Sequence, residues 1–327
     1  MESRTTMISV ILNEPWEAAH FQQHWSAEEL TLYPVGTDAA AVAPTTQVLS
    51  VFIHTPVRAA DLARLPELKL IAIRATGYDH VDLDYCQAHG IAVCNVPAYG
   101  ERTVAEYAMG LLLAAARHIV PSTLRLQREW RGDVQGLRGV DLHGKTLGLI
   151  GTGRIGRNMG QMTTGFGMRL LAYDLAPNLE WAQSVGATYV PLDTLYREAD
   201  VLSFHAPLTA STRHLFNYDS LALIKPGLIL INSSRGGLVQ NTALLAGLEQ
   251  GLIRAAGLDV IENEHLIGKN EPASDIALMQ QILAHPAVIA SAHNAYNSVE
   301  AIERIISTTI HNMQLFTQQR EIAYRLC

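Results

Sequence analysis

The stretch GKTLGLIGTGRIGR, residues 144–157, carries glycines in the spacing GxGxxG at Gly151, Gly153 and Gly156. An apolar, strand-like run at 146–150 precedes the motif, and a helical stretch at 157–166 follows it. At such a junction the first glycine allows a tight turn, the second lets the backbone approach a pyrophosphate, and the third permits close helix–strand packing. The helix N-terminus presents free N–H groups to the phosphates. The stretch therefore predicts a β-α unit that binds a dinucleotide.

The next apolar run ends in Asp174, 18 residues beyond Gly156. An acidic residue about 20 residues after the glycines commonly accepts hydrogen bonds from ribose hydroxyls. Its carboxylate would also repel a 2′-phosphate, and the residues that follow, Leu-Ala-Pro at 175–177, offer no cation to receive one. The cofactor is therefore predicted to be NAD rather than NADP. The alternative is that Asp174 is an ordinary turn residue at a strand end.

Apolar β-like runs alternate with helical segments on both sides of this unit. Before it, strands are expected at 7–12, 48–53, 68–75 and 91–96, with helices at 59–65 and 82–89. A long Ala/Leu-rich helix is expected at 102–117, with Pro121 just beyond its end. From the motif onward, strands are expected at 146–151, 169–174, 187–190, 200–205, 227–234, 255–260 and 287–292, before a closing helix at 298–318. This alternation predicts an α/β fold with parallel sheets covered by helices on both faces.

The two β-α series predict two parallel-sheet domains, Rossmann-like or flavodoxin-like. The first series is short for an independent domain, and the closing helix has no sheet of its own. That helix is therefore expected to return to the first domain, which makes this domain discontinuous. The predicted boundaries are 1–100 plus 299–327 for the first domain and 101–298 for the NAD-binding Rossmann domain.

Composition excludes several classes of protein. The chain has 327 residues, with 24 Lys+Arg against 31 Asp+Glu and a formal net charge of -7, and it has no basic block typical of nucleic-acid binders. No apolar run reaches the roughly 18 residues of a membrane span, and no secretory signal pattern is present. The three cysteines form no CxxC and no metal-ligand spacing. We therefore expect a reduced, cytoplasmic setting, with no metal, membrane or nucleic-acid partner.

Seven motifs occur in order along most of the chain: RATGYDHVDL (74–83), VPAYGERTVAEYAMGLLL (96–113), GKTLGLIGTGRIGR (144–157), HAPLTASTRHLFN (205–217), INSSRGGLVQ (231–240), GLDVIENE (257–264) and SAHNAYNS (291–298). In these motifs the chain resembles the D-isomer-specific 2-hydroxyacid dehydrogenase family, and it is most similar to the D-lactate dehydrogenase branch. The resemblance implies a homodimeric NAD-dependent enzyme whose first domain is the substrate domain. It further implies hydride transfer between NADH and a small 2-oxo acid, with D-lactate and pyruvate as the best candidates.

The resemblance implies a catalytic trio of Arg235, Glu264 and His293. The chemistry agrees, because reducing a 2-oxo acid requires a proton at the carbonyl oxygen, and histidine suits proton transfer near neutral pH. Glu264 would hydrogen-bond the other ring nitrogen and fix the tautomer, while the Arg235 guanidinium would match the substrate carboxylate. Each residue also has a purely structural alternative. Arg235 could form a surface ion pair, Glu264 could be a solvated loop acid, and His293 could be a structural histidine. Glu262 is a rival to Glu264, but the family's spacing from Asp259 favours Glu264.

The family pattern also implies binding residues. The expected cofactor contacts, besides the three glycines, are Arg154, Ile155, Asp174, His205, Ala206, Pro207, Thr212, Ser233, Ser234 and Asp259, with Arg235 also on the nicotinamide side. The expected substrate contacts are Thr76, Gly77, Tyr99 and Tyr296. Whether Phe52, Tyr78 or Trp130 shapes the side-chain pocket stays open, because aromatic residues fill cores as readily as sites.

The chain departs from the family pattern at three places, with Ser291-Ala292 for the usual Thr-Pro, Gln240 for Asp, and His265 for Pro. None of these removes a reacting group, so they bear on loop geometry. Two alternative functions stay open: an NAD(H)-sensing, corepressor-like binding protein, and a dehydrogenase for another 2-hydroxy acid (glyoxylate/glycerate, branched or aromatic). A formate-dehydrogenase-like activity is disfavoured, because formate oxidation needs no His–Glu pair for proton transfer.

Overall fold

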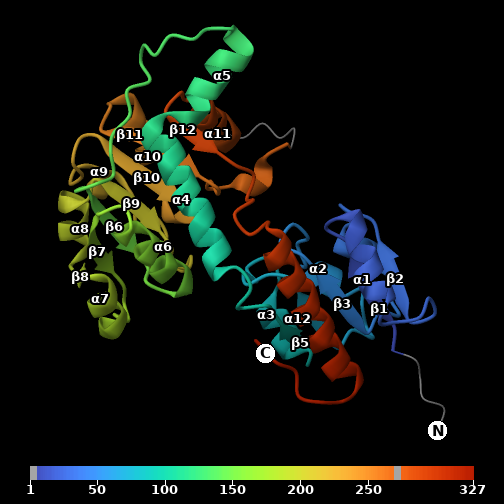
Figure 1. Cartoon of the computed structure of the whole chain (residues 1–327). Helices are drawn as coiled ribbons and strands as arrows, with labels where there is room; N and C mark the ends of the chain where they lie inside the picture. Colours follow the sequence, from blue (N-terminus) through green and yellow to red (C-terminus); the bar gives the residue numbers. More distant parts are fainter. Residues whose placement is uncertain (1–5, 269–273) are drawn as a thin grey trace. The chain divides into compact units, whose positions relative to one another are not determined.

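The computed structural model describes residues 6–268 and 274–327. The chain divides into two compact units (Figure 1), of which one comprises Met1–Tyr99 with Ser298–Cys327 and the other comprises Gly100–Asn297. Each of the two boundaries between the units lies one residue earlier in the chain than the boundary predicted from the sequence. Both units contain a parallel sheet, so the predicted α/β class with two parallel-sheet domains is confirmed.

The first unit is built on a five-stranded parallel sheet in the order β2-β1-β3-β4-β5. Its strands are β1 (Ile8–Ile11), β2 (Leu30–Tyr33), β3 (Val48–Val51), β4 (Leu70–Ile73) and β5 (Ala92–Cys94). Its helices are α1 (Ala18–Gln22), α2 (Ala59–Leu62), α3 (Leu83–Ala88) and α12 (Val299–Thr317). The strand order 2-1-3-4-5 is that of flavodoxin-like sheets. The closing helix α12 lies beside the elements of this unit (Figure 1), to which its chain segment returns.

Two elements of the first unit, β2 and α1, are absent from the sequence-based prediction. β2 is an edge strand of four residues, and only Leu30 among them is buried. α1 has five residues and buries only Phe21. Elements this short and this exposed leave no apolar periodicity that a sequence can display.

The second unit contains a seven-stranded parallel sheet in the order β12-β11-β10-β9-β6-β7-β8. Its strands are β6 (Thr146–Ile150), β7 (Arg169–Tyr173), β8 (Ala187–Tyr189), β9 (Val201–Phe204), β10 (Leu228–Asn232), β11 (Ile253–Leu258) and β12 (Val288–Ala290). Counted from β6, the first six strands follow the Rossmann order 3-2-1-4-5-6. The order reverses between β6 and β9, and ligands of such sheets bind at the carboxyl ends of the strands at that point.

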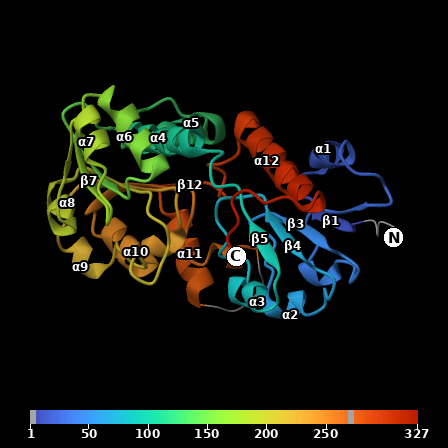
Figure 2. The same ribbon diagram turned by 90° about the horizontal axis from the view of Figure 1, so that it is seen from below.

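Helices cover both faces of this sheet (Figure 2), with α4, α6 and α7 on one face and α8, α9, α10 and α11 on the other. Their bounds are α4 (Glu101–Arg117), α5 (Ile119–Glu129), α6 (Arg154–Thr164), α7 (Leu179–Val185), α8 (Leu192–Glu198), α9 (Tyr218–Leu221), α10 (Asn241–Glu249) and α11 (Ser274–Ala284). α4 packs its Ala/Leu face into one apolar core with β6, β10 and β11, while a second core fills the opposite face. Burial on both faces explains why these strands are continuous apolar runs rather than alternating ones.

The helical region after α4 continues further than the sequence predicted. His118 adopts a left-handed conformation (φ 52°), which ends α4, and α5 begins at the next residue. Pro121 therefore lies in the first turn of α5, where a missing N–H removes no helical hydrogen bond. No single helix in the described part of the chain is long and apolar enough to cross a membrane. α4 and α5 meet that test only together, as a pair bent by 66°.

Candidate active site

The glycine-rich turn connects β6 to α6 and is shaped by the protein's own packing at two of its three glycines. Gly151 has φ +93°, and a Cβ there would lie 2.6 Å from the backbone nitrogen of Ala206. A Cβ on Gly156 would lie 2.1 Å from the carbonyl oxygen of Gly151. At Gly153, in contrast, a Cβ would meet nothing within 4 Å. The turn and the helix contact thus require the first and third glycines, and the open space at the second is where a ligand can approach the backbone.

The N-terminus of α6 faces this open space. Gly153 is the N-cap residue, and no side chain caps the helix. The first N–H groups of this 11-residue helix therefore lack a side-chain acceptor, and they form the positive end of the helix dipole. Arg154 and Ile155, the predicted pyrophosphate contacts, are its first two residues. This arrangement fits a dinucleotide pyrophosphate.

Asp174 follows β7 and bonds to the same glycine-rich turn. Its Oδ2 accepts hydrogen bonds from the backbone N–H of Thr152 (2.6 Å) and from the Thr152 hydroxyl (3.0 Å), and its Oδ1 accepts from the N–H of Ala176 (2.8 Å). Thr152 also bonds to the hydroxyl of Tyr189 (2.7 Å). Thr152 and Tyr189 hold the predicted ribose-binding carboxylate beside the glycines, and no sequence motif marks either residue.

His205 lies immediately after β9, next to the Gly151 turn. Its backbone N–H donates to the carbonyl of Ile150 (2.7 Å). Burial lowers the pKa of His205 to about 4, so the ring is neutral at physiological pH. Its Nε2 is hydrogen-bonded to the hydroxyl of Ser203 (2.8 Å). Further along, the Thr212 hydroxyl donates to the carbonyl of Pro207 (2.6 Å). Residues 205–212, which include Ala206, are the segment predicted to contact the adenosine part of the cofactor. These contacts place the segment where the strand order reverses between β6 and β9.

The loop after β10 carries Ser233, Ser234 and Arg235. Asn232, the last residue of β10, shapes this loop, because its side-chain amide donates to the carbonyl of Arg235 (2.9 Å) and its amide oxygen accepts from the N–H of Ser234 (3.1 Å). The Ser234 hydroxyl donates to the carbonyl of Ala206 (2.7 Å), which joins the ends of β9 and β10. The Arg235 Nη1 donates to the carbonyl of Ser234 (2.8 Å). The Ser233 hydroxyl oxygen is buried and has no hydrogen-bond partner among the described residues.

The structure brings Glu264 and His293 together. The Nδ1–H of His293 donates to Oε1 of Glu264 over 2.7 Å, and both side chains are partly exposed. The rival carboxylate, Glu262, instead accepts from His214 (2.6 Å) and Arg213 (3.0 Å). Of the two acids, only Glu264 is therefore paired with the predicted proton donor in the described residues.

Asp259 positions the loop that carries His293. Its side chain is buried (1% exposed), and its carboxylate accepts from the Ser291 hydroxyl (2.6 Å) and from the N–H groups of Asn294 and Ala295 (2.8 Å each). Its backbone carbonyl accepts from the N–H of His293 (2.9 Å). His293 has φ 50°, a left-handed conformation that is uncommon for residues other than glycine, and the bonds from Asp259 hold the loop in it. Ser291, one of the departures from the family pattern, supplies one of these bonds.

All the predicted catalytic and cofactor residues of the second unit follow the carboxyl ends of parallel strands at one edge of its sheet. The glycine turn follows β6, Asp174 follows β7, and His205 follows β9. Arg235 comes after β10, Asp259 and Glu264 after β11, and His293 after β12. Among the described residues, no group of three or more His, Cys, Asp or Glu side chains is arranged to hold a metal ion.

The predicted substrate contacts are divided between the two units. In the first unit, Thr76 and Gly77 follow β4, and the Thr76 hydroxyl donates to the carbonyl of Val96 (2.9 Å). Tyr99 is partly buried, and its carbonyl accepts from Arg304 Nε (2.6 Å). Tyr296 belongs to the second unit and is partly buried.

The three aromatic residues left open by the sequence differ strongly in exposure. Phe52 is 3% exposed, which fits a core residue. Tyr78 is 43% exposed, and Trp130, at the end of α5, is 89% exposed. Tyr78 and Trp130 are therefore free to contact other molecules, whereas Phe52 reaches almost no solvent.

Comparison with known proteins gives a consistent result. A family profile described as D-isomer specific 2-hydroxyacid dehydrogenase, NAD binding domain, matches residues 109–295. The chain is 37% identical to the hydroxypyruvate reductase of Thermotoga maritima, over 90% of this chain and 94% of that protein. It is also 37% identical to the D-lactate dehydrogenase of Escherichia coli, over 75% of each chain.

Solved structures give the same match at the level of the fold. A D-lactate dehydrogenase from Aquifex aeolicus, in complex with NAD and lactic acid, superimposes with a TM-score of 0.85 at 30% identity and covers 95% of this chain and 96% of its own. A pyruvate reductase of Chlamydomonas reinhardtii superimposes with a TM-score of 0.86 at 33% identity, over 98% of each chain.

Proposed function

The chain belongs to the D-isomer specific 2-hydroxyacid dehydrogenase family, and we propose that its reaction is the reversible reduction of pyruvate to D-lactate with NADH. It is an NAD-dependent oxidoreductase of this family, with two Rossmann-type parallel-sheet units.

The observation that carries the proposed chemistry is the 2.7 Å hydrogen bond between His293 and Glu264. Bound NADH supplies a hydride to the carbonyl carbon of the substrate. The carbonyl oxygen then needs a proton, and an imidazole is suited to deliver it near neutral pH. Because Glu264 engages Nδ1, the ring keeps one orientation and leaves Nε2 to transfer the proton. In the reverse direction the same nitrogen accepts the hydroxyl proton of the hydroxy acid.

We assign substrate binding to Arg235 and the Thr76–Gly77 loop. A guanidinium presents a planar fork that matches a carboxylate and stabilises charge developing on the adjacent carbonyl oxygen. The Arg235 side chain is anchored by its bond to the Ser234 carbonyl, which limits the orientations that the fork can adopt. Backbone N–H groups at Thr76 and Gly77 would hold the carboxylate, as the family resemblance implies.

Cofactor binding is proposed for the residues at the carboxyl edge of the second unit's sheet. The α6 N-terminus with Arg154 and Ile155 would hold the pyrophosphate, and Asp174 would accept from the ribose hydroxyls. The adenosine side would lie against the segment from His205 to Thr212. The buried, unpartnered hydroxyl of Ser233 supports a polar ligand on the nicotinamide side, near Ser234, Arg235 and Asp259.

Pyruvate is preferred because D-lactate dehydrogenases recur among the similar proteins, and one of the solved structures holds lactic acid. Hydroxypyruvate and aromatic 2-oxo acids are the competing substrates, since a hydroxypyruvate reductase is 37% identical to this chain and an aromatic 2-oxoacid reductase is 35% identical. The test is kcat/KM with NADH for pyruvate, hydroxypyruvate, glyoxylate, 2-oxoisocaproate and phenylpyruvate. The highest value for pyruvate is expected. A higher value for another acid reassigns the substrate, and no turnover with any of them, combined with intact NADH binding, would favour a corepressor-like binding protein.

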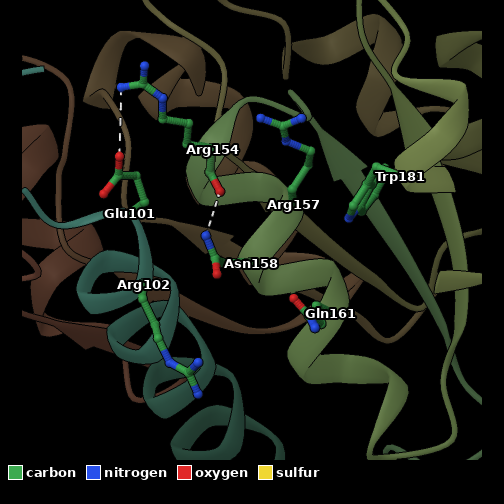
Figure 3. Close-up of a pocket in the computed structure, with 7 residues that line it drawn as sticks. All are labelled: Glu101, Arg102, Arg154, Arg157, Asn158, Gln161 and Trp181. Atoms are coloured by element: carbon green, nitrogen blue, oxygen red, sulfur yellow. Dashed lines mark hydrogen bonds and ion pairs between the residues drawn. The ribbon is translucent and has the colours of Figure 1, made fainter. Parts of the chain in front are cut away.

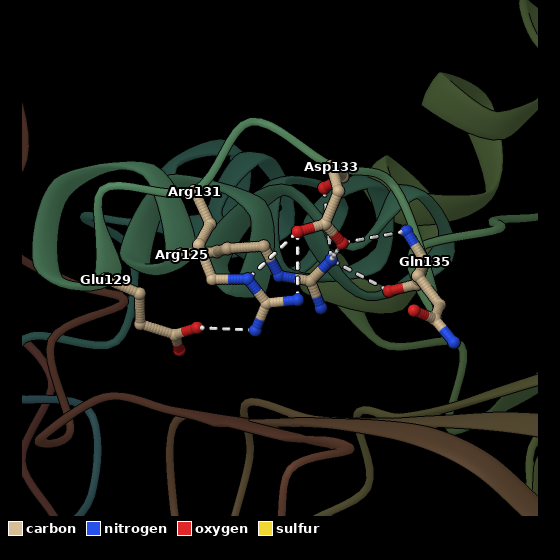
Figure 4. Close-up of polar contacts among 5 residues, drawn as sticks. All are labelled: Arg125, Glu129, Arg131, Asp133 and Gln135. Carbon is tan, nitrogen blue, oxygen red and sulfur yellow. Dashed lines mark hydrogen bonds and ion pairs between the residues drawn. The ribbon is translucent and has the colours of Figure 1, made fainter.

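We propose a homodimer formed through α5 and the segment after it. Leu126 and Trp130 are 56% and 89% exposed, and Val134 is 79% exposed, so three apolar side chains close together in sequence are uncovered in the single chain. Polar contacts order the chain around these residues (Figure 4): Arg125 Nη1 lies 3.1 Å from an Asp133 carboxylate oxygen, and it donates to the Gln135 carbonyl over 2.7 Å. Arg131 pairs with Asp133 as well (2.9 Å). The apolar side chains are thus presented on an ordered segment, which suits a second copy of the chain.

Light scattering tests the dimer. The wild-type protein is expected to run at twice the 35.7 kDa mass of the chain, and the double variant Leu126→Asp/Trp130→Asp is expected to run as a monomer. Leu179→Asp, at a residue 72% exposed on α7, is the matched control and should remain dimeric. A monomeric wild type would refute the dimer. A cytoplasmic location is also proposed, and the three free thiols in the structure support it.

A further inference from the structure

A cavity of about 430 Å³ lies beside the glycine-rich turn, on the face of α6 that is turned away from the sheet. Its lining comes from three helices (Figure 3): the first turn of α4, one face of α6, and Trp181 of α7. The lining residues are Glu101, Arg102, Arg154, Arg157, Asn158, Gln161 and Trp181. All of them belong to the second unit, and only Arg154 is among the predicted cofactor contacts.

The cavity concentrates positive charge in a protein whose formal net charge is -7. Three guanidinium groups and one carboxylate line it. Glu101 is 3.7 Å from Arg154, and Arg102 pairs outside the lining with Glu106 (2.9 Å). Arg157 is partly buried and forms no ion pair or hydrogen bond within the described part of the chain. Desolvating an unpaired guanidinium is unfavourable, and an anion would offset that cost.

Two helix N-termini reinforce this charge. α4, of 17 residues, and α6, of 11 residues, both begin at the cavity, at Glu101 and Arg154. Each is preceded by a glycine N-cap, Gly100 or Gly153, with no side-chain capping bond. The positive end of the α4 dipole therefore adds to the field of the guanidinium groups, and that of α6 is shared with the cofactor pyrophosphate.

The aromatic wall of the cavity is fixed in place. Trp181 packs against α6 so closely that a Cβ on Gly160 would lie 2.7 Å from its ring, and its ring meets that of Tyr189 edge-on at 6.4 Å. Its indole Nε1 is buried and has no hydrogen-bond partner among the described residues. The amide of Asn158 donates to the carbonyl of Arg154 (2.9 Å), which holds that side chain at the cavity wall.

We propose that this cavity, next to the NAD site, is a binding site for a small phosphorylated anion carrying at least two negative charges, contacted by Arg157 and Arg102, which are not among the cofactor contacts. Guanidinium groups pair with phosphate oxygens through parallel charge-assisted hydrogen bonds, and three arginines are among the residues that line a space of about 430 Å³. The proposal does not depend on which 2-oxo acid the enzyme reduces.

Calorimetric titration of inorganic pyrophosphate, at constant ionic strength and with NAD⁺ saturating, tests the proposal. Saturation keeps pyrophosphate out of the cofactor's own phosphate site. We expect one bound pyrophosphate per chain, with affinity weakened about tenfold or more by Arg157→Gln, because one charge-assisted interaction is lost. Arg197→Gln removes an equal charge from α8, on the opposite face of the sheet, and should leave the affinity unchanged. NAD⁺ affinity, measured on each variant, should match the wild type.

Three results would overturn the proposal: no binding of pyrophosphate once NAD⁺ is saturating, binding that Arg157→Gln leaves unchanged, or equal weakening by Arg197→Gln. If Arg157→Gln fails to fold, Arg102→Gln replaces it, since that side chain is 77% exposed and its loss leaves no buried partner. A parallel titration with ADP identifies the ligand class. Tighter binding of ADP than of pyrophosphate assigns the site to nucleoside diphosphates, and weaker binding assigns it to compact phosphorylated anions.

Discussion

Replacing Asp259 by Asn is expected to destabilise the protein and to abolish most of its turnover, because Asp259 holds the loop that carries His293. One carboxylate oxygen accepts from the Ser291 hydroxyl and the Asn294 N–H, and the other accepts from the Ala295 N–H. Asparagine keeps a single acceptor oxygen, so at least one buried donor would face the new amide NH₂.

The size of the effect follows from these contacts. A hydrogen bond to a charged group contributes about 1.5–3 kcal/mol, and an unsatisfied buried donor costs about 1–3 kcal/mol. Losing one such bond and weakening the other two gives an expected loss of about 2–4 kcal/mol in the free energy of unfolding. His293 should then leave its left-handed conformation, and kcat should fall about 100-fold or more, since general acid catalysis contributes about 10²–10⁴-fold.

Urea unfolding and steady-state kinetics with NADH and pyruvate measure both effects. Glu262→Gln is the matched control, because it makes the same chemical change at a carboxylate that bonds to His214 and Arg213 rather than to the 291–295 loop. The control should retain kcat within about twofold, since glutamine keeps an oxygen that can accept from His214 and Arg213 and the change leaves the 291–295 loop untouched. If Asp259→Asn instead raised the KM for NADH with kcat and stability unchanged, Asp259 would act as a cofactor contact only, and the reasoning would be refuted.

Three further predictions concern single side chains. His293→Ala should lower kcat by about 10²–10⁴-fold while NADH affinity, measured by fluorescence titration, stays unchanged; a kcat near wild type would exclude His293 as the proton donor. Asp174→Ala should weaken NADH binding by about tenfold, the value of one charged hydrogen bond, and bring NADH and NADPH affinities closer; an unchanged preference for NADH would contradict the ribose role. Burial depresses the pKa of His205 to about 4 in the folded state. As the pH falls, the unfolded chain therefore binds a proton at this histidine before the folded chain does. The free energy of unfolding should fall by about 3 kcal/mol between pH 6.5 and pH 4. Urea midpoints across this range test the last prediction, and in His205→Asn the fall should be correspondingly smaller; an equal fall in that variant would assign it to other groups.

The sequence could predict the parts of the fold that rest on local patterns. The strands of the second unit are continuous apolar runs because both faces of its sheet are covered, and the GxGxxG turn occurs where backbone geometry excludes a Cβ at Gly151 and Gly156. Edge strand β2 and helix α1 could not be found, since each buries a single side chain. The sequence does not predict helix α5, because a proline just past a helical pattern is typical of a helix end, whereas the left-handed His118 places Pro121 in the first turn of a new helix.

The candidate site was predictable where spacing within a motif identifies a residue, and not where a role depends on contacts distant in sequence. Spacing from Asp259 favoured Glu264 over Glu262, and the structure pairs Glu264 with His293. Tyr189 lies 37 residues from Thr152, so no local pattern links the two. The bonds of Asp259 to the 291–295 loop likewise cross more than 30 positions, and they turn a predicted cofactor contact into a residue that also positions His293.

The most direct test of the proposed reaction is the configuration of the lactate formed from pyruvate and NADH by the purified protein. Chiral chromatography of the product is expected to give D-lactate, formed in equal amount to the NADH consumed, and Glu264→Gln should lower the amount formed per unit time without changing its configuration. L-lactate, or consumption of NADH without lactate, would contradict the account.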